Sequence, residues 1–337
     1  MKFLVIGLGS MGKRRIRNVR QLKGGDIAGY DLRSDRRDEV ASEYGIPVFD
    51  DLDNALSKFA PDALIVSTPP NLHMALAERG LSLGKHVFSE AGTTTEGMAQ
   101  VIKLADRTGL VAAPSCTMRF QPSIKLMKQL LDQNAIGRIL TFTHHCGQYL
   151  PDWHPFEDYR KYYVSRQETA ACREMVPFEL TWLLWLMQQD VRSVAALRGK
   201  VSDLECEVDD VFQLLMRFSR GTLGHLLIDV VARAPIRATR ILGETGVLEW
   251  NAGLQSLRHY DAATRLWTEY PEPPPSVEQG YSSMSAEGMY IGEMNAFIKA
   301  CRGEAPFPYT FAEDVQMIEI MRAAEKSSDT GSHVELV

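Results

Sequence analysis

A turn with regularly spaced glycines near the start of the chain constrains the fold more than any other feature. The apolar run Phe3-Leu4-Val5-Ile6 leads into Gly7-Leu8-Gly9-Ser10-Met11-Gly12. Such spacing is typical of a strand, a tight turn and a helix start, where the second glycine lets the backbone approach a diphosphate and the third allows close packing. Free N–H groups at the helix start hold the phosphates. The turn therefore predicts a dinucleotide site.

A carboxylate at the end of the next apolar run completes this pattern. Residues 26–30 lead to Asp31, which stands roughly 20 residues beyond Gly12, where a carboxylate accepts hydrogen bonds from the adenosine ribose. The cations Arg33, Arg36 and Arg37 follow and could meet a 2′-phosphate, but Asp31 would repel one. We therefore expect NAD rather than NADP, with Arg33 among the cofactor contacts.

Strands and helices alternate over about the first 115 residues, which predicts a doubly wound parallel sheet. Helices are expected to end at Gly45, Gly84 and Gly109, with Thr95 capping the last, and residues 110–113 form the sixth strand. Strand ends of such a sheet face the cofactor. The residues expected there are Thr68, Pro69, Asn71 and His73 after the fourth strand, and Glu90 and Ala91 after the fifth.

Beyond Arg119 the pattern changes to a second α/β domain. We expect helices at 122–132 and 172–189, and strands at 139–146, 211–218 and 223–231. Strand 211–218 alternates apolar and polar residues, which predicts an open, mostly antiparallel sheet with helices on one face. Val211 and Leu215 lie on its other face, a candidate surface for a homo-oligomer. The predicted domains are 1–120 and 121–337.

Length, charge and cysteines limit the classes of function. A chain of 337 residues is too long for one typical core, and its formal net charge of -6 argues against general affinity for nucleic acid. No apolar run is long enough for a membrane span. Five scattered cysteines favour reduced thiols and a cytoplasmic protein. The segment His144-His145-Cys146 predicts no metal site, because adjacent strand residues point to opposite faces.

Several landmarks in combination resemble the glucose-fructose oxidoreductase and inositol dehydrogenase family along essentially the whole chain. They are the GLGSMG turn, STPPNLH, GKHVFSEAG, Arg119-Phe120, Ala135-Ile136-Gly137-Arg138 and GETGVLEW. The resemblance implies an N-terminal Rossmann domain, a C-terminal α/β domain and, between them, a pocket for a sugar, cyclitol or sugar nucleotide. It also implies a dimer or tetramer formed through the open sheet face.

The chain departs from that family at both of its usual proton carriers. The family's Glu-Lys-Pro is here Glu90-Ala91-Gly92, and its Asp with a His four residues on falls on Glu174 and Phe178. General acid–base catalysis is typically worth about 10²–10⁴-fold, so other residues must carry the proton if the chain is a dehydrogenase.

Glu174 is the first candidate for that base, since the resemblance places it at the family's acidic position; a structural carboxylate near Arg173 is the equal alternative. The aromatic loop 148–166 offers His154, Lys161 and Tyr163, although ordinary loop contacts explain each of them as well. Aromatic rings and arginines suit a sugar pocket. The predicted substrate contacts are Arg119, Trp153, Arg160, Arg173, Phe178 and Glu179.

Three functions are compatible with these residues. The first is an NAD-dependent oxidoreductase acting on a hydroxyl or keto group of a sugar, sugar acid or nucleotide sugar. The second is a redox-neutral sugar enzyme that uses tightly held NAD for elimination or epimerisation. The third is a non-catalytic NAD-binding regulatory protein.

Overall fold

The computed structural model describes residues 1–153, 158–272 and 287–336, which form two compact units. The first contains Met1–Thr117 and Tyr290–Gln316, and the second contains Met118–Met289 and Met317–Val337. The sequence placed a single boundary near residue 120. The first unit also includes a late segment of the chain, because apolar side chains of that segment pack into its core.

The first unit is built on a parallel sheet of six strands in the order β3-β2-β1-β4-β5-β6. These strands are β1 (Lys2–Ile6), β2 (Asp26–Tyr30), β3 (Val48–Phe49), β4 (Ala63–Val66), β5 (His86–Ser89) and β6 (Ala112–Pro114). β1 and β4 are buried along almost their whole length, as expected for strands covered on both faces. This sheet confirms the predicted doubly wound fold.

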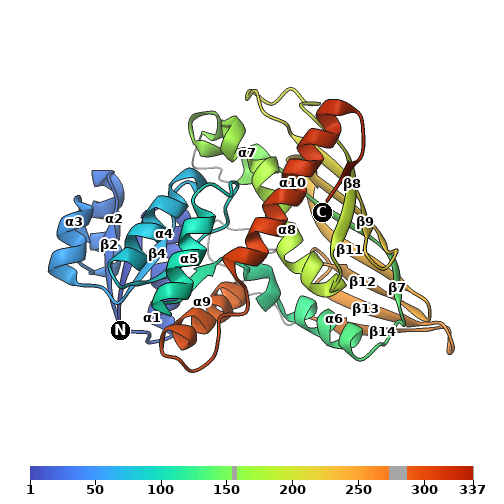
Figure 1. The fold of residues 1–337 in the computed structure, drawn as a ribbon, viewed down its shortest axis with the longest axis horizontal. Helices are drawn as coiled ribbons and strands as arrows, with labels where there is room; N and C mark the ends of the chain where they lie inside the picture. The colour runs from blue at the N-terminus through green and yellow to red at the C-terminus, as the bar shows by residue number, and fades with distance from the viewer. Residues whose placement is uncertain (154–157, 273–286, 337) are drawn as a thin grey trace. The chain divides into compact units, whose positions relative to one another are not determined.

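Helices flank this sheet (Figure 1). They are α1 (Ser10–Gln21), α2 (Ser34–Tyr44), α3 (Leu52–Asn54), α4 (His73–Ser82), α5 (Met98–Thr108) and α9 (Glu287–Cys301). Gly45 and Gly109 end their helices in the left-handed conformation, as predicted. The prediction of Thr95 as a cap is wrong, because α5 begins at Met98 after Gly97, whose φ is 80°.

The second unit is built on a nine-stranded sheet in the order β14-β13-β12-β11-β7-β10-β9-β8-β15. Its strands are β7 (Ile139–Tyr149), β8 (Val191–Gly199), β9 (Val211–Phe218), β10 (Leu223–Asp229), β11 (Val231–Gly243), β12 (Gly246–Asn251), β13 (Ser256–Asp261), β14 (Leu266–Pro271) and β15 (Val334–Glu335). β10 pairs with β7 in parallel, while the other neighbours pair antiparallel. This sheet confirms the mostly antiparallel prediction.

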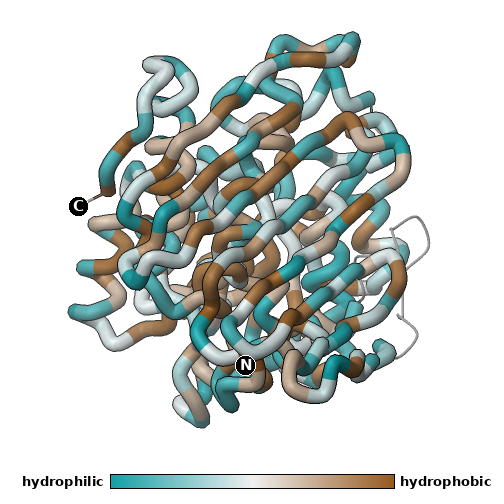
Figure 2. Tube along the Cα trace, turned by 90° about the vertical axis from the view of Figure 1, so that its right-hand side faces the viewer, coloured by the Kyte–Doolittle hydropathy of each residue, from teal (hydrophilic) through white to brown (hydrophobic). Residues whose placement is uncertain are grey.

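Helices cover one face of the larger sheet. α6 (Pro122–Asp132) packs against β13, and α8 (Ala171–Met187) packs against β9 and β10 (Figure 1). The predicted inward side chains of β9 are all buried: Phe212, Leu214, Met216 and Phe218. Figure 2 shows the opposite face, where hydrophobic and hydrophilic residues alternate along the strands.

Two further α-helices remain, of which α7 (Leu150–Trp153) lies in the second unit and α10 (Phe311–Thr330) has residues in both units. α7 follows β7, and α10 leads to the last strand. Within the ranges that the structure describes, no helix has both the length and the apolar character that a membrane crossing requires.

Candidate functional site

The glycine turn has the geometry of a phosphate cradle. Gly7 has a φ of 91°, and a Cβ atom placed on it would lie 2.5 Å from the Ser67 carbonyl oxygen. A Cβ atom on Gly12 would lie 1.8 Å from the Gly7 carbonyl oxygen, so α1 and β1 meet at a distance that only glycine permits. α1 begins at Ser10 directly after Gly9, and its first N–H groups are those that a diphosphate would occupy.

Asp31 is held beside this turn by backbone donors. Its Oδ2 accepts a hydrogen bond of 2.8 Å from the Leu8 N–H, and its Oδ1 accepts one of 2.9 Å from the Arg33 N–H. The residue is 8% exposed, so part of the carboxylate remains within reach of a ligand. The turn and this carboxylate together have a geometry that fits an adenosine diphosphate.

The three arginines after Asp31 have different partners. Arg33 forms an exposed ion pair of 2.5 Å with Asp35, and Arg37 donates to the Asp31 carbonyl oxygen at 2.8 Å. Arg36 instead extends over the turn: its Nη1 lies 3.7 Å from Asp31 Oδ2 and 3.3 Å from the Cβ position of Gly9. Arg36 therefore stands closer to the predicted cofactor site than Arg33 does.

The segment after β4 is shaped by a buried histidine. Pro69 and Asn71 are exposed, whereas His73 is 1% exposed and its Nε2 lies 2.8 Å from the Thr68 carbonyl oxygen. Burial lowers the pKa of His73, which keeps the ring neutral. His73 thus positions the loop at Thr68.

Glu90 follows β5, next to the half-buried Ala91, and an arginine from α1 holds its carboxylate. Arg15 Nε lies 2.6 Å from Glu90 Oε1 and Arg15 Nη2 lies 2.8 Å from Oε2. Ser67 donates to the same Oε1 at 3.3 Å. Sequence reasoning missed Arg15, because a basic helix face is usually a solvated one. The only local signal is its position one turn after the glycine turn.

In the second unit, the prediction of Glu179 as a substrate contact is wrong. Glu179 is fully buried between α8 and the sheet, where its Oε2 lies 3.0 Å from His144 Nε2 and 2.8 Å from Trp182 Nε1. Its Oε1 pairs with Arg237 Nη2 at 2.9 Å. Burial acts to raise the pKa of Glu179, but Arg237 and the hydrogen bonds from His144 and Trp182 lower it to about 2.

Glu174 and Phe178 lie on the accessible side of α8. They are four residues apart, so they share one helical face, and both are half-buried. Arg237 lies 5.9 Å from the centre of the Phe178 ring. These two positions therefore remain candidates for contact with a substrate.

Two other predicted substrate contacts have structural partners instead. Arg119 is 6% exposed, and its Nε donates to the Thr181 carbonyl oxygen of α8 at 2.9 Å. Arg173 binds Glu325 of α10, with 2.6 Å between Nε and Oε1, and donates to the Glu168 carbonyl oxygen at 2.8 Å. Both side chains therefore brace α8, and their contact with a substrate stays a prediction.

In the aromatic loop, the residues predicted to contact substrate or carry a proton differ in exposure and in their partners. Tyr163 is half-buried, and its ring stacks edge-on with Tyr162 at 5.1 Å. Arg160 pairs with Asp158 at 2.7 Å and with Glu205 at 3.0 Å, while the Lys161 side chain is 81% exposed. Trp153 ends α7. His154 lies outside the described residues.

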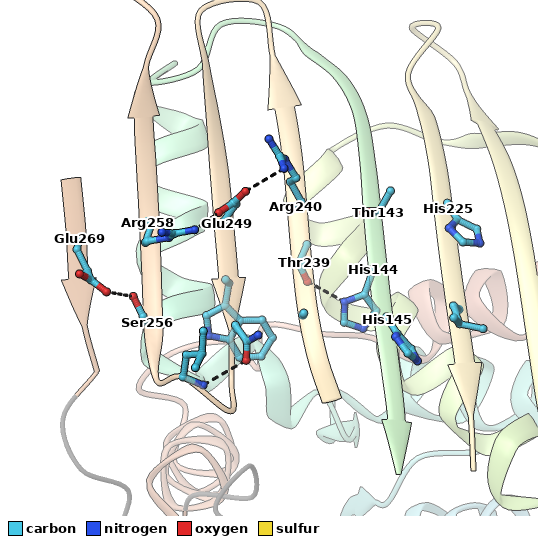
Figure 3. A pocket seen from close by; sticks show the side chains of 15 residues that line it. Thr143, His144, His145, His225, Thr239, Arg240, Glu249, Ser256, Arg258 and Glu269 are labelled. Atoms are coloured by element: carbon cyan, nitrogen blue, oxygen red, sulfur yellow. Dashed lines mark hydrogen bonds and ion pairs between the residues drawn. The ribbon is translucent and has the colours of Figure 1, made fainter. Parts of the chain in front are cut away.

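The open face of the larger sheet carries a hollow of about 590 Å³, which both apolar and charged side chains line. Figure 3 shows His145 and His225 on one side of it and Arg240, Glu249 and Arg258 on the other. His145 points to this face and bonds Asp229, while His144 points inward, as predicted from strand geometry. Among the described residues, no three His, Cys, Asp or Glu side chains form a group that could hold a metal ion.

Family models match both parts of the chain. Residues 1–115 match an oxidoreductase family with an NAD-binding Rossmann fold, and residues 124–249 match the GFO/IDH/MocA C-terminal domain.

Individual relatives match over different lengths. The UDP-N-acetylglucosamine 3-dehydrogenase of Acidithiobacillus ferrooxidans is 31% identical over 72% of this chain and 71% of its own length. The 4-carboxy-2-hydroxymuconate-6-semialdehyde dehydrogenase of Sphingobium sp. is 32% identical over 36% of this chain, and the match spans only 40% of that protein. The WlbA dehydrogenase of Bordetella pertussis, solved with NADH and UDP-GlcNAcA, superposes with a TM-score of 0.84 at 21% identity, over 100% of this chain and 98% of that one.

Proposed function

We propose, from the premise that this chain belongs to the GFO/IDH/MocA oxidoreductase family, that it oxidises a hydroxyl group, or reduces a keto group, of a sugar, sugar acid or nucleotide sugar. The glycine turn with Asp31 is the observation that carries the proposal, because it fits a dinucleotide. The relative that acts on UDP-N-acetylglucosamine and the neighbour solved with UDP-GlcNAcA support the substrate class. NAD supplies hydride transfer when bound.

NAD rather than NADP is the proposed cofactor. The N–H groups of Leu8 and Arg33 orient the Asp31 carboxylate. In such a fold this carboxylate binds the adenosine ribose, and its negative charge would repel a 2′-phosphate. Asp31→Ala is expected to weaken NAD binding at least tenfold, and an unchanged affinity would remove the ribose argument. Asp26→Ala, which removes an exposed carboxylate at the other end of β2, is the matched control and should leave NAD binding unchanged.

Glu174 is the proposed base that takes the hydroxyl proton. It is the acidic residue on the accessible side of α8, and Tyr163 and Lys161 of the aromatic loop are the next candidates. Glu174→Gln should lower kcat about 10²–10⁴-fold with a smaller change in KM. Glu168→Gln, an exposed carboxylate before the same helix, is the matched control and should leave kcat unchanged. Full turnover of Glu174→Gln would refute the assignment.

The proposed substrate contacts are Trp153, Arg160 and Phe178. An aromatic ring can lie against a sugar face, and the arginine can bind an anionic group. These roles rest on residue type and on position in the aromatic loop and α8.

A panel of sugars, sugar acids and nucleotide sugars assayed for NADH formation tests the function as a whole, together with a search for copurified NAD(H). Net NADH formation supports the dehydrogenase. Product formation without NADH would establish redox-neutral chemistry instead, and cofactor binding without turnover of any compound would favour a regulatory protein.

We further propose that a second copy covers the open sheet face, since Leu197, Leu215 and Leu223 expose 72%, 59% and 49% of their surface there. Leu215→Glu should convert an oligomer to monomer in sedimentation analysis, and a monomeric wild type would refute the interface. A cytoplasmic location is proposed as well, supported by the scattered positions of the five cysteines.

A further inference from the structure

We propose that Glu90, locked in place by Arg15, makes the cofactor site of the first unit favour oxidised over reduced nicotinamide. This inference rests on the NAD binding proposed above. It adds a redox-state preference that the dinucleotide fold alone does not confer.

Arg15 is the centre of a three-member ion cluster. Its guanidinium is fully buried, contacts both oxygens of Glu90, and reaches Glu293 Oε2 of α9 at 2.8 Å. It also lies 4.6 Å from the centre of the Phe88 ring and 5.5 Å from that of Tyr290. A bidentate guanidinium on a rigid helix leaves the Glu90 carboxylate a single orientation.

Only one member of this cluster reaches the surface. The side chains of Arg15 and Glu293 are 0% exposed, whereas that of Glu90 is 14% exposed. The Glu293 carboxylate accepts hydrogen bonds from the Cys116 N–H at 2.6 Å and from the hydroxyls of Thr117 and Ser115 at 2.8 Å and 3.0 Å. Glu293 therefore anchors the guanidinium from inside, while Glu90 presents the cluster's negative charge outward.

The sheet topology places Glu90 under the nicotinamide half of a bound dinucleotide. Ligands of such sheets lie outside the carboxyl ends of the strands, across the point where the strand order reverses. That point lies between β1 and β4, and Asp31 after β2 marks the adenosine side. The other half of the cofactor then extends over the ends of β4 and β5, where Glu90 stands.

The two redox forms of the cofactor differ in the charge of the nicotinamide ring. The oxidised nicotinamide ring is a cation, the reduced ring is neutral, and their adenosine halves are identical. A fixed carboxylate near the ring therefore attracts the oxidised form more strongly. Arg15 is also paired with Glu293, so neutralising Glu90 would remove the one negative charge of the cluster that reaches the surface.

The test compares dissociation constants of NAD⁺ and NADH, measured by calorimetry on the full chain. Glu90→Gln should raise the ratio Kd(NAD⁺)/Kd(NADH) about tenfold. Asp31→Asn is the matched control at the adenosine side: it should weaken both forms and leave the ratio within about twofold, because both forms carry the same ribose. Glu293→Gln, buried behind Arg15, should shift the ratio in the same direction by a smaller factor.

A ratio unchanged by Glu90→Gln, in protein whose circular dichroism matches wild type, would overturn this inference and leave the proposed function standing. A reversed shift in Glu293→Gln would overturn it as well. Failure of the wild type to bind either form would overturn both proposals together.

Discussion

The two units each bury a cluster of ion pairs, and the clusters differ in which member meets the solvent. In the first unit a buried cation, Arg15, holds two carboxylates, and one of them is partly exposed. In the second unit the carboxylate of Glu179 lies at the centre and is 0% exposed. The cluster in the first unit therefore holds a negative charge at the surface, whereas the cluster in the second unit connects a helix to a sheet.

Energetics support this distinction. Burying an ion pair gains little net stability, because desolvation offsets the Coulomb attraction, but removing one partner strands a charge in the interior. Glu179 connects α8 to His144 on β7 and Arg237 on β11, so its removal should lower the free energy of unfolding. Removal of Glu90, which reaches the surface, should mainly change the affinity for the cofactor.

The largest effect is expected from Arg15→Met, which leaves two carboxylates without their common cation. The free energy of unfolding of the first unit should fall by about 5 kcal/mol, at the upper end of values for broken buried pairs. Urea unfolding followed by circular dichroism measures the loss. Arg15→Lys keeps a charge but loses the bidentate contact and should cost less; equal losses for both variants would mean that packing on Phe88, not charge, dominates.

Arg237→Met tests the second cluster by the same substitution. We expect a loss of about 3–5 kcal/mol, because Glu179 stays buried without its cation. All five tryptophans lie in the second unit, so their fluorescence follows its unfolding. NADH affinity should stay as in wild type. A weakened affinity would show that this cluster also serves the cofactor, and the contrast between the clusters would fail.

Acid should reveal the ionised state of Glu179. Its pKa is lowered from 4.5 to about 2 in the folded protein, so unfolding takes up a proton when the pH lies between these values. The stabilisation, about 3 kcal/mol, is present above pH 4.5 and is lost as the pH falls toward 2. Glu179→Gln should be less stable at pH 7 and should show a flatter pH dependence below 4.5. Parallel pH profiles for the two proteins would contradict this assignment.

The smallest effect is expected from Glu325→Gln, which breaks the pair between Glu325 (21% exposed) and Arg173 (16% exposed). Water still reaches both groups and lowers the cost of breaking the pair, so the free energy of unfolding should change by about 1 kcal/mol. Tryptophan fluorescence in urea again provides the measurement. A loss as large as that of Arg237→Met would show that burial does not separate strong from weak pairs in this unit.

Hydrophobic periodicity and the positions of glycines predicted the parallel sheet and three of the nine strands of the second sheet, β7, β9 and β10. The glycine turn, the buried run of β4 and the alternating residues of β9 each give a local signal, and each element formed as predicted. The left-handed glycines that end α2 and α5 are equally local. Such features depend on neighbours within a few residues, which the sequence displays directly.

The candidate site was less predictable, because its partners come from distant segments. The sequence predicted Glu179 as a substrate contact, but in the structure its carboxylate is paired with His144 and Arg237 of the sheet. The sequence favoured a solvated Arg15, but in the structure Arg15 is buried and paired with Glu293 of α9. A single sequence taken by itself contains no signal for such pairings, since helical periodicity cannot tell which element covers a face.

The return of α9 to the first unit has a consequence for how the protein is made. Met294, Phe297 and Ile298 fill a core shared with Phe3 and Val5, which leave the ribosome long before them. At translation rates of roughly 5–20 residues per second, the nascent first unit waits on the order of ten to thirty seconds for these side chains. During that interval its apolar surface is open to chaperones and to other nascent chains, so folding of this unit is completed late in synthesis.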